Sequence, residues 1–185
     1  MARPSSTRTA SKPPSGIQNP GGLPELLLYR VSQLLAVAGA PITRLCEGRF
    51  GITRREWRLI ALLAERDGIS SSALAERAQL DRARTSRSLT ALAEKRLITR
   101  RSTTGDGRAV RIQLTASGRT LFESLWPLAV DHHRQLLQCL TPTQIGAVDS
   151  ALTALHARAE QLLLAYPDLP LADRRRGAAR RLTNV

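Results

Sequence analysis

Aromatic residues are scarce in this chain of 185 residues: two tryptophans, two tyrosines and two phenylalanines make up only 3% of it. So few rings argue against the stacking platforms that hold single-stranded nucleic acids, and against RNA-binding modules that stack bases on aromatic side chains. Long apolar runs are missing too, since no stretch approaches the roughly 20 residues of a membrane-spanning helix. The sequence therefore predicts no membrane segment.

Cysteine is almost absent as well. Cys46 and Cys139 are the two cysteines, too few to form a disulfide framework, which fits a reducing cytoplasm. The N-terminus has no apolar core and does not resemble a secretory signal. Both thiols are explained as small buried side chains. A redox-sensing regulator that uses Cys46 and Cys139 is kept as an alternative.

Motifs of the common enzyme classes are missing from the chain. There is no Gly-rich phosphate loop, no paired metal motif and no nucleophile elbow. A zinc site needs several converging ligands, and the adjacent His132 and His133 would point about 100° apart on a helix. We therefore expect no catalytic residues, no metal and no cofactor.

Negative charge is in short supply. The chain has 15 acidic residues against 28 basic ones, a formal net charge of +13, and only Lys12 and Lys95 of the basic residues are lysines. The arginine guanidinium presents a planar fork of donors that suits phosphate oxygens and guanine edges. A polyanionic partner is therefore expected, with nucleic acid as the first choice.

Periodic apolar positions predict a mainly α-helical protein with one small β-hairpin. Residues 1–22 and 167–185 are predicted to be basic tails, the first of them disordered. Between the tails we expect six helices: residues 24–47, Thr53 to about 66, Ser70 to about 78, Asp81 to about 96, Thr115 to about 140, and Pro142 to about 165. Two strands are expected between the fourth and fifth helices, at 97–101 and 109–114.

Polar residues at the predicted helix starts support these boundaries. Thr53 with Glu56, and Thr141 with Gln144, have the spacing of capping boxes, and Ser70 and Asp81 are N-cap residues in type. The last helix carries a heptad-like apolar row, which needs a partner, either the other long helices or a second chain.

A short capped helix, a tight turn and a second helix with basic first turns form a helix-turn-helix, whose second helix reads the major groove. Residues 81–111 hold nine basic residues against three acidic ones, a difference of six. The candidate DNA contacts on the second helix are Arg82, Arg84, Thr85, Ser86, Arg87 and Ser88. A solvated basic face is the alternative, and the hairpin that follows can act as a wing.

These features resemble the MarR family of transcription regulators over residues 24–164. The similar segments are Ile52–Ile60, Ser72–Glu76, Leu80–Arg87, Leu92–Leu97, and Asp106-Gly107-Arg108 followed by Ile112–Thr115 and Gly118. The resemblance implies a winged helix-turn-helix homodimer whose first, fifth and sixth helices interlock. It also implies two recognition helices in successive major grooves of a pseudo-palindrome, and a wing Arg108 in the minor groove, oriented by Asp106.

Two positions depart from the family pattern. Gly107 stands at the wing tip where the family often has a basic residue, and Arg96 stands where the family usually has glycine. A left-handed helix end at Arg96 would cost about 1 kcal/mol. The alternatives are that Arg96 extends the helix or contacts phosphate.

The resemblance also implies an effector, because such regulators commonly respond to small aromatic acids. Arg30 is the candidate for the carboxylate, Trp57 for the ring, and His132 or His133 for a polar contact. The alternatives are an interface ion pair for Arg30, a core position for Trp57 and exposed histidines. Residues 29–65 look like regulators of nicotinate catabolism, which would make 6-hydroxynicotinate the effector.

We therefore predict a cytoplasmic, homodimeric, sequence-specific regulator of double-stranded DNA. It is expected to act as a repressor that a small aromatic carboxylate such as 6-hydroxynicotinate releases from a pseudo-palindromic operator. A winged-helix module that binds other proteins through its long helices is the alternative from a different functional class. Salt-dependent, sequence-selective binding to duplex DNA would distinguish the two.

Overall fold

The computed structural model describes residues 16–102 and 110–165, and the chain forms two compact units, residues 1–136 and 137–185. The predicted mainly helical fold with a two-stranded hairpin is confirmed. In the described ranges no helix has both the length and the apolar character needed to cross a membrane. The predicted wing residues Asp106 and Arg108 lie outside the described residues.

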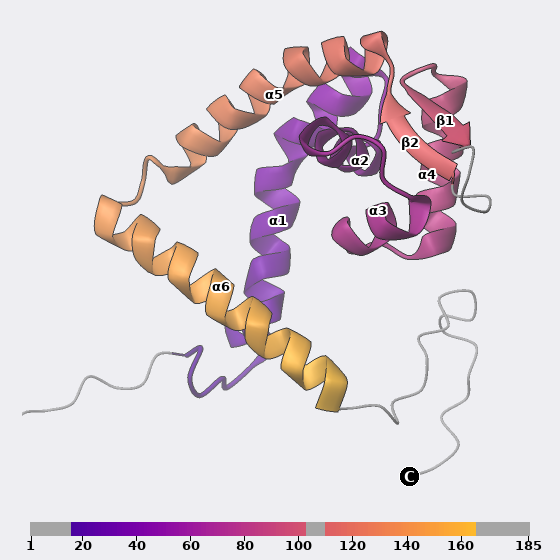
Figure 1. The fold of residues 1–185 in the computed structure, drawn as a ribbon. Coiled ribbons are helices and arrows are strands. Elements are labelled where there is room, and N and C mark those ends of the chain that lie inside the picture. The colour runs from indigo at the N-terminus through magenta and orange to yellow at the C-terminus, as the bar shows by residue number, and fades with distance from the viewer. Residues whose placement is uncertain (1–15, 103–109, 166–185) are drawn as a thin grey trace, which may run out of the picture. The chain divides into compact units, whose positions relative to one another are not determined.

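The elements follow the predicted order (Figure 1). The first unit contains a 3-10 turn η1 (Leu23–Glu25), α1 (Leu27–Arg44), a wide π-helical turn η2 (Leu45–Arg49), α2 (Arg54–Glu65), α3 (Ser71–Arg77), α4 (Arg82–Glu94), β1 (Ile98–Ser102), β2 (Val110–Leu114) and α5 (Ala116–Leu137). The second unit contains α6 (Pro142–Ala165).

The predicted N-caps of the helix-turn-helix are confirmed. The Thr53 hydroxyl accepts the N–H of Glu56 at 3.2 Å, and the Glu56 carboxylate accepts the N–H of Thr53 at 2.6 Å, which completes the capping box of α2. Ser70 and Asp81 each accept a backbone N–H of the first turn of α3 and α4. Such caps satisfy N–H groups that a helix start leaves without partners.

The first helix differs from its prediction. A single helix over 24–47 was expected, but α1 starts at Leu27 and passes into η2, after which Gly51 turns the chain with a φ of +63°. Residues 16–22, which fall within the predicted tail, include a turn, and the N–H of Gly21 donates to the Glu25 carboxylate. Local structure therefore starts before the predicted boundary.

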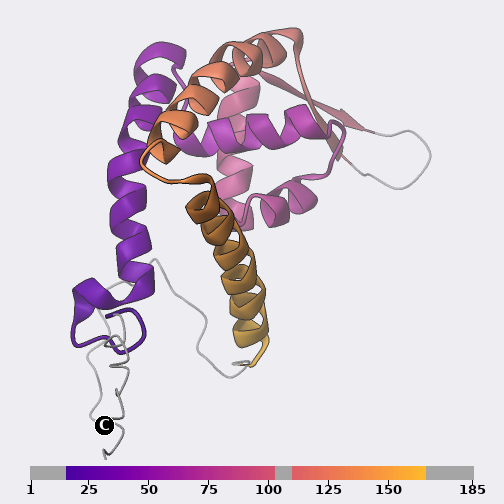
Figure 2. The same ribbon diagram turned by 90° about the vertical axis from the view of Figure 1, so that its left-hand side faces the viewer.

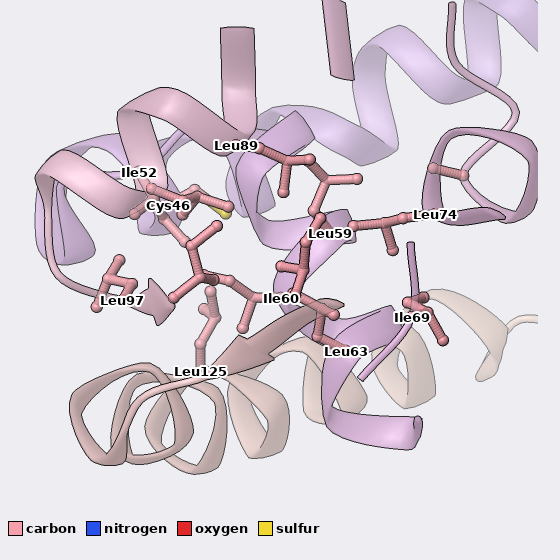
Figure 3. Close-up of a cluster of buried hydrophobic side chains, with 14 residues drawn as sticks. Cys46, Ile52, Leu59, Ile60, Leu63, Ile69, Leu74, Leu89, Leu97 and Leu125 are labelled. Carbon is pink, nitrogen blue, oxygen red and sulfur yellow. The ribbon is translucent and has the colours of Figure 1, made fainter. Parts of the chain in front are cut away.

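Helix α2 supplies the centre of the hydrophobic core. Leu59, Ile60 and Leu63 are fully buried, and Figure 3 shows them among side chains from the rest of the first unit: Ile69, Leu74, Leu89, Leu97 and Leu125. Trp57, for which a core position was the alternative to an effector contact, is partly buried against this core, and it stacks on Phe122 of α5 with ring centroids 5.7 Å apart.

The β-hairpin is tied to the helix-turn-helix by the loop after α2. Strands β1 and β2 pair antiparallel, from Ile98 opposite Leu114 to Ser102 opposite Val110. Ile112 also donates its N–H to the Ile69 carbonyl at 3.0 Å and accepts the N–H of Gly68 at 2.9 Å. This extra pairing joins the middle of β2 to the loop after α2, and Figure 2 shows the hairpin on the side of the first unit away from α1.

Helix α4 ends at Arg96 in the left-handed conformation, with a φ of +56°. The N–H groups of Arg96 and Leu97 donate to the carbonyls of Ala93 and Leu92, which is the hydrogen-bond pattern of a Schellman motif. The left-handed alternative for Arg96 is therefore confirmed, and the alternative that it extends the helix is wrong.

The left-handed Arg96 predicts a stabilising substitution. Arg96→Gly is expected to raise the free energy of unfolding by about 1 kcal/mol, because glycine adopts a positive φ without the clash of a Cβ atom. The urea unfolding midpoint measures the change. Arg96→Ala is the matched control, since it removes the exposed guanidinium and keeps the Cβ atom. Equal urea midpoints for Arg96→Gly and Arg96→Ala would show that the left-handed backbone at residue 96 is not strained by a Cβ atom.

Helix α6 starts at the second predicted capping box, where the Thr141 hydroxyl accepts the N–H of Gln144 and the Gln144 side chain accepts the N–H of Thr141. Its apolar row is exposed within the chain, with Val148 and Leu152 showing 43% and 55% of their surface. Apolar rows of this length are usually covered by a partner.

Candidate nucleic-acid interface

Helices α3 and α4 form the helix-turn-helix, and the turn between them is fixed on both sides. Gln79 adopts a φ of +52°, and the N–H of Leu80 donates to the Ala75 carbonyl at 3.0 Å. From α2, the Arg58 guanidinium donates to the Ala78 carbonyl at 3.0 Å. The turn thereby sets the direction of α4 relative to α3.

Helix α4 has a buried and an exposed face. Its inward residues follow helical spacing and are Thr85, Ser88, Leu89 and Leu92. Its first exposed turns carry Arg82, Ser86 and Arg87, and in the described ranges no carboxylate forms an ion pair with either arginine. This basic, acid-poor face is the surface that could enter a DNA groove.

Two predicted DNA contacts are corrected by this geometry. Thr85 is 0% exposed and its hydroxyl donates to the Asp81 carbonyl at 3.0 Å, while Ser88 is 8% exposed. Both lie on the core side because α4 starts right after Asp81, which turns positions 85 and 88 inward along with Leu89. In the described structure both side chains therefore lie against the core and not on the exposed face of α4.

Arg84 has a local partner. Its Nε lies 3.1 Å from the Asp81 carboxylate, and its side chain is 34% exposed. This pairing across the first turn of α4 holds the guanidinium beside the N-cap. Arg82 and Arg87 are therefore better placed than Arg84 to reach DNA.

Arg100 is a residue of this surface that the sequence analysis did not single out. It lies on β1, and its guanidinium donates to the Thr90 hydroxyl of α4 at 3.3 Å. The signal was present in the strand alternation, because Arg100 is two residues from the buried Ile98 and so shares its face toward α4. The hairpin thus adds positive charge beside the exposed face of α4.

A separate cavity of about 420 Å³ lies within the first unit, between α1, α2 and α5. Three of the four predicted effector residues, Trp57, His132 and His133, are in its lining, and the fourth, Arg30, is not. Arg30 is exposed farther toward the start of α1. The cations of the cavity are instead Arg54 and Arg58 of α2.

The polar groups of this cavity favour an anion. No carboxylate is in its lining, and in the described part of the chain neither arginine forms an ion pair. The Arg54 guanidinium lies against Gly39 of α1, where a Cβ atom would overlap it. The Nε2 of His132 lies 2.8 Å from the Ala38 carbonyl, which requires a proton on Nε2, and apart from His133 the remaining walls are apolar.

The two cysteines and the potential metal ligands are the groups that a redox or metal site would use. Cys46 is fully buried in the core, and burial raises its pKa, which lowers the fraction of reactive thiolate. Cys139 is exposed in the second unit, so the prediction that both thiols are buried is wrong for this residue. Within residues 16–102 and 110–165, no three His, Cys, Asp or Glu residues gather as a metal site would require.

Comparisons with known proteins agree with this architecture. Residues 50–109 match the model of the MarR family. A MarR-family regulator from Silicibacter pomeroyi is 26% identical, with a TM-score of 0.64 over 74% of this chain and 92% of that one. A MarR/EmrR-family regulator from Acinetobacter sp. ADP1 is also 26% identical, with a TM-score of 0.64 over 72% and 96%.

A third similar structure contains DNA. Streptococcus pneumoniae FabT in complex with DNA is 21% identical, with a TM-score of 0.62 over 73% of this chain and 95% of that one. At that identity the likeness shows a shared fold. A search of curated protein sequences finds no match to the chain.

Proposed function

We propose that this chain is a DNA-binding transcription regulator of the MarR family and not an enzyme, and that it acts in the cytoplasm as a homodimeric repressor. The observation that carries the proposal is the exposed basic face of α4, where Arg82 and Arg87 stand free of carboxylates in the described ranges. Arg100 and Arg101 of the hairpin add charge on the element that follows.

The dimer is supported by exposed apolar surface. Leu34 on α1 and Leu152 on α6 each show more than half of their surface, at 58% and 55%. Covering such rows with a second copy would remove them from water. A two-fold dimer would place two recognition helices about 34–36 Å apart, which matches successive major grooves of a pseudo-palindromic operator.

The test is a binding titration with duplex DNA from upstream of the protein's own gene and its neighbours, at several salt concentrations. We expect one segment to bind at least 1,000-fold more tightly than scrambled duplex, since specific sites are typically ~10³–10⁷ tighter. Affinity that falls with salt would reflect phosphate contacts. Binding no better than to scrambled duplex would overturn the repressor and favour a protein-interaction module.

We further propose that a small aromatic carboxylate, such as 6-hydroxynicotinate, binds the cavity between α1, α2 and α5. Its carboxylate would pair with Arg54 and Arg58, and its ring would lie against Trp57. This replaces Arg30 with two arginines that line the cavity. Binding would release the operator by a typical allosteric coupling of ~1–3 kcal/mol, or about 5- to 150-fold in affinity.

Arg54→Gln is expected to weaken 6-hydroxynicotinate binding about 10- to 150-fold, because a hydrogen bond to a charged group contributes ~1.5–3 kcal/mol. Operator binding without ligand should stay as in the unsubstituted protein. Tryptophan fluorescence measures ligand binding, since Trp57 lines the cavity. The matched control is Arg30→Gln, which should bind ligand normally. Weaker 6-hydroxynicotinate binding in Arg30→Gln, with normal binding in Arg54→Gln, would contradict this proposal and assign the carboxylate to Arg30.

A further inference from the structure

An ion pair between a buried carboxylate and a partly exposed ammonium joins the start of α2 to the end of α4. The Nζ of Lys95, the C-cap residue of α4, lies 2.9 Å from the Oε2 of Glu56. The Glu56 side chain is only 4% exposed and that of Lys95 is 37% exposed. The ammonium also donates to the Gly51 carbonyl at 2.8 Å. Two segments 39 residues apart in the chain are therefore held together by charge.

The same carboxylate oxygen also accepts a backbone hydrogen bond. Glu56 Oε2 accepts the N–H of Thr53 at 2.6 Å, as part of the capping box that starts α2. One oxygen thus serves the N-cap of α2 and the C-cap of α4 together. A shift of the first turn of α2 would draw Lys95 along with Glu56, because a buried carboxylate cannot exchange its ammonium partner for water without a large cost.

Lysine at this position stands out in a chain that otherwise uses arginine. Lys95 is the only lysine in the described ranges, and it lies in the basic stretch that the sequence analysis assigned to DNA. An ammonium is a compact charge whose donors can point to separate oxygens, whereas a guanidinium is a planar fork. Here the ammonium is directed at Gly51 and Glu56. The Lys95 ammonium is therefore bound by groups of the protein itself.

The first turns of α2 line the cavity with one face and hold Lys95 with another. Arg54, Trp57, Arg58 and Ala61 line the cavity at helical spacings of three and four. Glu56 lies among them in sequence but is buried, on the side of Leu59, Ile60 and Leu63. A ligand that shifted the first turns of α2 would therefore also shift the backbone that carries Glu56.

Several elements meet at the Lys95 end of the ion pair. Directly after Lys95, the carbonyl of Arg96 accepts the Thr115 hydroxyl at 2.8 Å, and the carbonyl of Leu97 accepts the Thr115 N–H at 3.0 Å. The hairpin starts at Ile98 and α5 at Ala116. The end of α4, the base of the hairpin and the start of α5 therefore meet beside Lys95.

We propose that Glu56 and Lys95 are positioning residues that couple the cavity to the orientation of α4. Glu56 transmits a shift of α2 to Lys95, and Lys95 turns the recognition helix and the hairpin base with it. Lys95 contacts no phosphate in this mechanism. The coupling rests on the proposed function of the cavity as an effector site, but the positioning of α4 does not.

The test uses the double variant Glu56→Gln/Lys95→Met. The double variant removes both charges, and the side-chain amide that Glu56→Gln introduces still offers a carbonyl oxygen to the Thr53 N–H. Folding of the double variant then does not depend on an unpaired buried carboxylate. Thermal unfolding first shows that a variant is folded. Operator affinity is then measured against salt concentration, with and without saturating 6-hydroxynicotinate.

We expect the double variant to bind the operator at least about 10-fold more weakly, with an unchanged salt slope, and the ligand to release it less than about 2-fold. The matched control is Arg101→Met, an exposed arginine of β1. If it contacts phosphate, its salt slope should fall by about 0.9 per copy while release by ligand persists. The control thus shows how a lost phosphate contact looks in the same assay.

An unchanged operator affinity in the double variant, or a salt slope that falls as in a phosphate-contact variant, would overturn the positioning role. Normal release by ligand would overturn the coupling. Failure of the proposed effector looks different, because the unsubstituted protein would then neither bind nor respond to 6-hydroxynicotinate. In that case the affinity and salt slope still decide the positioning role of Lys95.

Discussion

Replacing Arg87 with alanine is expected to weaken binding to the operator by roughly 30-fold to more than 10,000-fold. A bidentate arginine contact to a base contributes ~1–3 kcal/mol of discrimination, and a dimer presents the residue twice, which gives ~2–6 kcal/mol. Arg87 is exposed on α4 beside Ser86, and no described carboxylate pairs with it. Nothing within the described protein competes with DNA for its guanidinium.

The measurement is a titration of the variant against the operator and against operators with single base-pair changes. If Arg87 reads a base, the variant should lose its preference at one position in each half-site and keep the others. A loss that is uniform across all sequences, with a lower salt slope, would instead assign Arg87 to phosphate. An unchanged affinity would show that this face of α4 is not the reading surface.

Arg84→Ala is the matched control on the same helix. Its guanidinium is held by Asp81 at 3.1 Å, so we expect a smaller loss of affinity than for Arg87→Ala. Helix start signals stay intact in the control, because Asp81 still accepts the N–H of residue 84. A larger loss for Arg84→Ala would mean that the Asp81 pair opens on binding DNA.

Local signals in the sequence were sufficient for the boundaries of most elements. Thr53, Ser70, Asp81 and Thr141 each begin a helix as predicted, because a cap depends on residues three positions apart. The two strands also lie within one residue of their predicted ranges. Helix caps and strand alternation depend on residues that are close in the sequence, so both can be recognised before the fold is known.

Contacts between elements that are distant in the chain could not be predicted from such short-range patterns. The sequence shows Glu56 as a capping residue, but nothing local indicates that Lys95 reaches its carboxylate. Arg30 was named as an effector residue from resemblance and does not line the cavity, whereas Arg54 of α2 does. Thr85 was grouped with its polar neighbours, although the helical period turns it inward. These features depend on how helices pack, which short sequence patterns do not specify.

Gly118→Ala is expected to destabilise the protein by about 3 kcal/mol, at the upper end of typical overpacking effects. Gly118 is buried in the first turn of α5, where an added Cβ atom would overlap the Leu97 carbonyl oxygen and also crowd Leu114. That carbonyl cannot move away freely, because it accepts the Thr115 N–H. The Thr115 hydroxyl in turn accepts the N–H of Gly118 at 3.0 Å. Helix α5 would have to separate from the end of α4 to admit one methyl group.

The direction of this effect is opposite to helix propensity, since alanine is favoured over glycine within a helix by about 1 kcal/mol. Gly146→Ala in α6 provides the matched control, because nothing lies within 4 Å of a Cβ atom at that position. We expect the control to unfold at an equal or higher urea concentration, and Gly118→Ala at a clearly lower one, both at one protein concentration so that dimer formation does not differ. If Gly118→Ala matched its control, the start of α5 would have room to move away from Leu97. The junction beside Lys95 would then be too loose to pass a shift of α2 on to α4.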